Sequence, residues 1–173
     1  YNRDTMRPDI LTTHELNQLA QSELMRGASA EVAARMNPLW KHKLLRAGET
    51  FLTAQQPGDA LYFVISGTIK IHVEQADGSD VFIDISAAGD VVGEMSIMDN
   101  AARSASATAM EETHVLWMER TAIESEMNLT PLIAINLARI LSHRLRRATE
   151  RIQVMATRDT FGRVAHQLQF FQN

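Results

Sequence analysis

The chain has 173 residues, of which 45% are hydrophobic and 22% charged, and its formal net charge at pH 7 is −4. This composition is typical of a folded globular protein, and the negative charge argues against a general nucleic-acid surface on these residues. The sequence contains no cysteine, which excludes disulfides and thiolate chemistry and favours a cytoplasmic location. No apolar run approaches the roughly 18 residues of a membrane-spanning helix, so no membrane partner is expected.

Residues 1–40 are predicted to form a helical N-terminal segment. Thr12 and Glu15 have the spacing of a capping box, which marks the start of a helix. Ser29 is a suitable cap for a second helix, and the Asn-Pro pair that begins at Asn37 would end it.

Residues 41–128 have the pattern of short strands separated by turns. Glycines recur at intervals of nine to eleven residues from Gly48 to Gly89, as expected for a sandwich or a barrel. The clearest β-rich runs are residues 61–65, 68–73, 81–85, 106–109 and 114–118. The sequence therefore predicts a mainly β fold with flanking helices.

Residues 89–107, with the sequence GDVVGEMSIMDNAARSASA, gather the groups needed to hold a phosphate diester. Gly93 lets the backbone approach a ligand closely, and the residues after it are suited to one short helical turn. Arg103 offers a planar, charged fork for a phosphate, and Ser104 adds a hydroxyl. Glu94 repels a phosphate but accepts strongly from a sugar hydroxyl. A pocket with both preferences indicates a cyclic nucleotide, whose ribose 2′-OH and 3′,5′-phosphate lie on adjacent edges.

The run GEMSIM at residues 93–98, followed by ARSA at 102–105, resembles the phosphate-binding cassette of cyclic nucleotide-binding domains, GE(L/M)(A/S)L and then (P)R(S/T/A)A. The resemblance covers about residues 40–160. It implies an eight-stranded β-roll of the jelly-roll type, whose later half is interrupted by the cassette, residues 93–105. It also implies cAMP or cGMP as ligand, without a metal. The expected nucleotide-binding residues are Ile83, Val92, Gly93, Glu94, Met95, Ser96, Arg103, Ser104, Ala105, Arg144 and Thr149.

A long helix is predicted over residues 129–158, because Thr130 followed by proline is a strong helix start. Its apolar residues recur at alternating spacings of four and three, which is the seam of a two-stranded coiled coil. The residues expected in a homodimer interface are Leu141, Leu145, Ala148, Ile152 and Met155. A second stripe of Ile133, Leu137 and Ile140 is expected to lie on the β-roll. The alternative is that both stripes are buried within one monomer.

Residues 142–171 more narrowly resemble the dimer helix and the following helix of bacterial regulators in the cAMP receptor protein and fumarate-nitrate regulator family. In that family a Thr-Ser pair contacts the base, and the matching residues here are Ala148 and Thr149. The choice between cAMP and cGMP therefore stays open. Arg144 matches an arginine that faces the cassette glutamate. Residues 159–173 would begin a helix-turn-helix domain, and the resemblance implies DNA binding only through the part of that domain absent from this chain.

Together with these patterns, the resemblance implies a cyclic nucleotide sensor and dimerisation region of a bacterial transcription regulator, in which ligand shifts the arrangement of the dimer helices. One alternative is a stand-alone cyclic nucleotide-binding module that regulates another protein; another is a degenerate member that binds nothing. A third is a cupin-like metalloenzyme, which would need clustered histidine ligands. His42, His72 and His114 stand apart in the sequence, and no catalytic motif is found, so neither a metal site nor an enzyme is expected.

Overall fold

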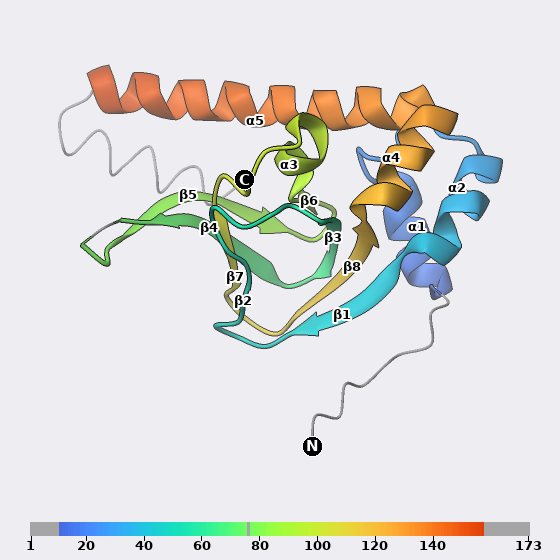
Figure 1. Cartoon of the computed structure of the whole chain (residues 1–173), viewed down its shortest axis with the longest axis horizontal. Helices are drawn as coiled ribbons and strands as arrows, with labels where there is room; N and C mark the ends of the chain where they lie inside the picture. The colour runs from blue at the N-terminus through green and yellow to red at the C-terminus, as the bar shows by residue number, and fades with distance from the viewer. Residues whose placement is uncertain (1–10, 76, 158–173) are drawn as a thin grey trace. The chain divides into compact units, whose positions relative to one another are not determined.

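The computed structural model describes residues 11–75 and 77–157 (Figure 1). The chain divides into two compact units, of which the first ends at Leu137 and the second begins at Ala138. The first unit is mainly β with flanking helices, and the long helix α5 continues from it into the second. The predicted fold class is confirmed, whereas the predicted segment boundaries stay a prediction.

Eight strands form two four-stranded antiparallel sheets, with the orders β1-β8-β3-β6 and β2-β7-β4-β5. Consecutive strands β4 and β5 form a hairpin, drawn in green at the left of Figure 1. The strands are β1 Lys41–Leu45, β2 Thr50–Leu52, β3 Ala60–Ser66, β4 Thr68–Glu74, β5 Asp80–Ala87, β6 Val91–Val92, β7 Ser106–Ala109 and β8 Thr113–Glu119.

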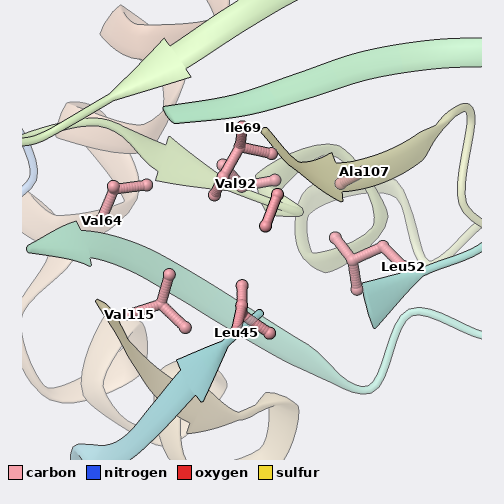
Figure 2. Close-up of a cluster of buried hydrophobic side chains, with 8 residues drawn as sticks. Leu45, Leu52, Val64, Ile69, Val92, Ala107 and Val115 are labelled. Atoms are coloured by element: carbon pink, nitrogen blue, oxygen red, sulfur yellow. The ribbon is translucent and has the colours of Figure 1, made fainter. Parts of the chain in front are cut away.

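The core of the β-roll lies between the two sheets. Side chains from strands of both sheets converge there, as Figure 2 shows, and each is at most 8% exposed. Successive residues of a strand point to opposite faces, so alternate residues of each strand reach this core. The cluster comprises Leu45, Leu52, Val64, Ile69, Val92, Ala107, Ala109 and Val115, with Phe51, Tyr62 and Ile71 packed against it.

The helices and one 3-10 turn flank the strands. They are α1 Thr13–Gln21, α2 Ala30–Met36, η1 Asn37–Leu39, α3 Glu94–Asp99, α4 Arg120–Leu129 and α5 Pro131–Thr157. The predicted capping box is confirmed: the Glu15 N–H donates to Thr12 Oγ1 at 3.3 Å, and Glu15 Oε2 accepts from the Thr12 N–H at 2.7 Å. Helix α4 was not predicted. It contacts β3 and β8, and its Ile123 is fully buried.

Polar side chains link α2 to α4, and α5 to the segment between α1 and α2. The Arg35 guanidinium on α2 donates to the Glu126 carboxylate on α4 through Nε and Nη2, at 2.9–3.2 Å. The Asn136 amide on α5 is buried and donates to the carbonyls of Leu24 and Arg26 at 2.8 and 2.9 Å. A buried amide is costly unless it is hydrogen-bonded, so these contacts fix the first turns of α5 against the segment that contains Leu24 and Arg26.

Helix α5 presents different surfaces along its length. Ile133 and Leu137, which belong to the first unit, are fully buried, and Ile140 is 8% exposed. By contrast, Leu145, Ile152 and Met155 are exposed by 68%, 66% and 56%. Within the ranges 11–75 and 77–157, no helix combines the length and the apolar character that a bilayer crossing requires.

Candidate functional site

The predicted cassette is built on a short helix that follows directly after a buried strand. Gly93 directly follows β6, has φ +89°, and serves as the N-cap of α3 without a side-chain cap. The helix ends at Asn100, which has φ +56° and whose N–H donates to the Ser96 carbonyl at 3.1 Å. The helical turn expected after Gly93 is therefore present, and two residues in left-handed conformation set its limits.

Gly93 and Arg103 occupy adjoining space. Arg103 Nη1 donates to the Gly93 carbonyl at 2.9 Å, and a Cβ at position 93 would lie 2.4 Å from the same Nη1. A side chain at position 93 would also have to adopt a positive φ. Glycine is thus required here both for backbone conformation and for the approach of the arginine.

The Arg103 guanidinium is buried, with the residue only 4% exposed. Besides the Gly93 carbonyl, it donates through Nη2 to the Ala60 carbonyl at 2.7 Å. Its Nε is buried and has no hydrogen-bond partner among the described residues. An arginine has five N–H donors, and a buried donor without a partner is costly. The arrangement therefore suits an additional acceptor, such as an anionic oxygen.

The electrostatic surroundings of Arg103 come from several elements. Burial lowers the pKa of Arg103 and the neighbouring Arg120 lowers it further, whereas Tyr62, Asp59 and Glu94 raise it. Burial raises the pKa of Tyr62, against the opposing effect of Arg103. Arginine nevertheless keeps its proton in proteins. The site thus holds a desolvated positive charge, which strengthens its attraction for an anion.

A pocket of about 150 Å³ lies beside Arg103, which is one of its lining residues. The other lining residues come from β2, β3 and the loop between them: Phe51, Leu52, Thr53, Gln56, Pro57, Asp59, Ala60 and Tyr62. Backbone bonds hold this loop against the cassette: the Arg103 N–H donates to the Gln56 carbonyl at 2.8 Å, and the Gln55 N–H donates to the Arg103 carbonyl at 2.9 Å. Sequence reasoning missed these residues, since only the β-roll topology brings them to the cassette.

Arg120, at the start of α4, ties the loop to the cassette helix and was also missed. Its Nη2 donates to the carbonyls of Gly58 and Ser96, at 2.5 and 2.7 Å, and its Nε donates to Gly58 at 3.0 Å. A Cβ on Gly58 would lie 2.2 Å from the Ser96 Cβ. This close packing explains the glycine at this point of the loop, which the sequence marked only as one of the regularly spaced glycines.

Several predicted site residues lie in or next to the cassette. Glu94 is the first residue of α3 and only 1% exposed, and Val92 and Ser96 are also buried. Met95 is 45% exposed, and the exposed Ser104 hydroxyl donates to its Sδ at 3.4 Å. Ala105, which follows, is half-buried. The cassette thus presents Met95 and Ser104 at its surface and keeps Glu94 and Arg103 inside.

Three predicted residues come from other elements. Ile83 lies on β5 and is 43% exposed. Arg144 and Thr149 belong to the second unit, on α5, where the Thr149 hydroxyl donates to the Leu145 carbonyl at 2.9 Å. The participation of these three residues in one site stays a prediction.

Two of the histidines that stand apart in the sequence are neighbours in the structure. His42 on β1 and His114 on β8 are stacked, with ring centroids 5.2 Å apart, and His42 Nδ1 lies 3.0 Å from His114 Nε2. The β1–β8 pairing brings together residues that are 72 positions apart in sequence. No local pattern carries that information.

Comparison with known proteins agrees with this architecture. The family model of the cyclic nucleotide-binding domain matches residues 42–129. A CRP-like cAMP-activated global transcriptional regulator of Mycobacterium tuberculosis is 33% identical over 150 residues, which cover 87% of this chain and 67% of that protein. The crystal structure of the Thermus thermophilus catabolite activator protein matches with a TM-score of 0.69 and 30% identity, over 78% of this chain and 63% of that chain.

A relative of another kind is Glutaminase 1 of Bradyrhizobium diazoefficiens, which is 31% identical over 150 residues, covering 83% of this chain and 23% of that protein. The chain spans about two thirds of the length of the two regulators. The family match, the identity to the mycobacterial regulator and the shared fold together show the family. The chain belongs to the cyclic nucleotide-binding domains of CRP-like transcription regulators.

Proposed function

We propose that this chain is the cAMP-sensing and dimerisation region of a transcription regulator, and that it acts by binding rather than by catalysis. The observation that carries the proposal is Arg103, which lines an open pocket and has a buried guanidinium whose Nε lacks a partner among the described residues. A phosphate oxygen there would satisfy this donor, in surroundings where charge-assisted bonds are strong.

The proposed division of roles within the cassette follows the chemistry of each group. Arg103 and Ser104 contact the phosphate, which carries the negative charge of the ligand. Glu94 accepts from the ribose 2′-OH, because a carboxylate cannot donate to a phosphate oxygen. Met95 and Ile83 are apolar and exposed, so they are suited to contact the faces of the sugar and the base. The roles of Arg144 and Thr149 stay those that the family resemblance implies: Arg144 faces Glu94 and Thr149 contacts the base.

We favour cAMP over cGMP because the name of the mycobacterial relative describes activation by cAMP. The opposing consideration is that Ala148 lacks the hydroxyl that the family uses at this position, leaving Thr149 alone to contact the base. A cytoplasmic location belongs to the same proposal, since cAMP-dependent transcription takes place there.

The dimer would form through the exposed seam of α5. Leu145, Ile152 and Met155 share one helical stripe and are more than half exposed, which is unfavourable for a lone helix in water. A second copy of the same helix would cover them in a coiled coil. cAMP would then shift the arrangement of the two helices, to the extent that it binds one arrangement more tightly than the other. DNA contact would require a further domain.

The second candidate function is a regulatory module attached to an enzyme. The observation in its favour is the 31% identity to Glutaminase 1 over a segment that makes up 23% of that protein. cAMP binding alone does not separate the two candidates, because both predict it. DNA binding by the full-length protein, measured with and without cAMP, separates them: cAMP-dependent binding supports the regulator, and its absence supports the module.

Calorimetric titration of the nucleotide-free chain with cAMP and with cGMP tests the sensor itself. The proposal predicts saturable binding of about one cAMP per chain, with cGMP weaker. Tighter binding of cGMP would correct the choice of base. Failure of both nucleotides to bind would contradict the sensor function and favour a degenerate member of the family.

A further inference from the structure

Glu15, His42 and His114 form a buried cluster on the outside of the β-roll, distinct from the cassette. The three side chains are exposed by only 4%, 8% and 11%, respectively. Glu15 Oε1 lies 3.5 Å from His42 Nδ1 and 3.6 Å from His114 Nδ1, and the two imidazoles approach to 3.0 Å. One ligand atom from each residue can be chosen so that all lie within 4.8 Å of one another.

The fold holds each of the three residues in place. The register of β1 and β8 pairs His42 with Leu116 and Leu44 with His114, so the two histidines are diagonal neighbours on one face of the sheet. Leu45 and Val115 point to the other face, into the core. Glu15 comes from α1, where Oε2 accepts from the Thr12 N–H and hydroxyl at 2.7 and 2.8 Å. These bonds fix the carboxylate and leave Oε1 directed at the imidazoles.

The distances fit a metal-binding site. With metal–nitrogen and metal–oxygen bonds of about 2.0–2.2 Å, neighbouring ligands of a tetrahedral ion lie about 3.3 Å apart. From His42 Nδ1, Glu15 Oε1 lies 3.5 Å away and His114 Nε2 lies 3.0 Å away, and both separations are close to this value. His42 Nε2 is buried without a hydrogen-bond partner among the described residues, whereas Nδ1 lies 3.0 Å from His114 Nε2 and 3.5 Å from Glu15 Oε1. With the ring proton on Nε2, Nδ1 offers its lone pair to an ion held between these three side chains.

We propose that Glu15, His42 and His114 bind one divalent transition-metal ion, with a water molecule as fourth ligand. Two imidazoles and a carboxylate suit Zn²⁺ or Co²⁺, whereas Mg²⁺ and Ca²⁺ prefer sites made of oxygen ligands. The ligands belong to α1, β1 and β8, so the ion links the N-terminal helix to the β-roll. Its role is structural, and the site does not depend on nucleotide binding by the cassette.

The test uses the tag-free chain, stripped of metal with a chelator and titrated with Co²⁺ while the visible spectrum is recorded. The proposal predicts one Co²⁺ per chain, with the intense absorption bands of tetrahedral rather than octahedral cobalt. His114→Asn should abolish these bands. Glu15→Gln, which keeps an oxygen for the capping box, should weaken binding by at least tenfold. His14→Asn should bind as the parent does, because His14 is exposed on α1 beside Glu15.

A second readout is thermal stability. At a Zn²⁺ concentration of about one hundred times the dissociation constant, the melting temperature should rise by roughly 5–10 °C in the parent and in His14→Asn, and stay unchanged in His114→Asn. Circular dichroism shows whether each variant is folded. Absence of tetrahedral cobalt bands in the folded parent would overturn the proposal and leave the cluster as an ion pair. Equal Co²⁺ binding by the folded His114→Asn variant would overturn it too.

Discussion

Arg103 Nη1 donates a 2.9 Å hydrogen bond to the Gly93 carbonyl and lies where a side chain at position 93 would begin. The two residues are ten positions apart in the chain, yet the conformation of one determines the room available to the other. The guanidinium reaches the first residue of the cassette because Gly93 has no Cβ. The position of the guanidinium therefore depends on the glycine as well as on the arginine.

Gly93→Ala should weaken cAMP binding by roughly tenfold or more, because the new methyl group displaces the guanidinium. It also forces alanine into a left-handed conformation, which costs about 1–2 kcal/mol. Gly78→Ala is the matched control, since Gly78 has φ +81° and no described residue other than its two chain neighbours lies within 4 Å of the place its Cβ would take. Urea unfolding and cAMP titration of both variants separate the two effects. Equal loss of cAMP affinity in the two variants would show that space around Arg103 is irrelevant.

Glu94→Gln should remove most of the preference for a ribose 2′-OH. A hydrogen bond to a charged group contributes about 1.5–3 kcal/mol, so the parent should bind 2′-deoxy-cAMP roughly 10- to 150-fold more weakly than cAMP. In the variant this ratio should fall to a few-fold, because the strong acceptor is gone. Titration of the parent and of Glu94→Gln, each with cAMP and with 2′-deoxy-cAMP, gives the four affinities from which the two ratios are calculated. An unchanged ratio would show that Glu94 does not contact the ribose 2′-OH.

The local signals in the sequence predicted the regular elements well. The Thr12–Glu15 capping box, the β-rich runs and the start of α5 at Pro131 each depend on residues close together in the chain, and each is found in the structure. Helix α4 was missed because Glu119, its N-cap, makes no side-chain cap bond. Its buried face also includes a glutamate, Glu126, instead of an apolar residue, so the apolar pattern of a helix is weak there.

The candidate site was predicted only in part, for a topological reason. Glu94 and Arg103 are close enough in sequence to form a motif, whereas Tyr62 and Arg120 reach the site through strand pairing and the path of α4. The same limit applies to His42 and His114, which become neighbours only through the β1–β8 register. Periodicity and spacing carry no information about such distant pairs.

Ile152→Asp should weaken the proposed dimer by roughly 100-fold or more. Burying a carboxylate in an apolar seam makes the free energy of association about 3 kcal/mol less favourable. Ile135→Asp is the control: Ile135 is 49% exposed on the same helix but lies outside the seam. Sedimentation velocity over a range of concentrations measures both variants against the parent. A dimer that tolerates Ile152→Asp as well as Ile135→Asp would place the interface elsewhere.

The pKa of the Asp80 carboxyl is lowered, chiefly because Lys70 Nζ donates to it at 2.6 Å, with a further contribution from His72. A carboxyl with a lower pKa in the folded state stabilises that state above its unfolded pKa, and the contribution is lost as the pH falls through the folded value. Lys70→Met should therefore raise the pKa of Asp80. Carboxyl NMR titration measures this shift, and Asp77, whose pKa is lowered chiefly by Ser79, should not respond. An unchanged pKa of Asp80 in Lys70→Met would show that Lys70 is not what lowers it.

The affinity of the Arg103→Ala variant for cAMP tests the central claim most directly. Removal of one partner of a buried charge pair costs about 2–5 kcal/mol, so binding should weaken roughly 30- to several thousand-fold relative to the parent. Arg46→Ala, at an exposed arginine on the β1–β2 turn, should bind as the parent does. If folded Arg103→Ala binds cAMP as tightly as Arg46→Ala, the cassette does not hold the phosphate through Arg103, and the account of this site is contradicted.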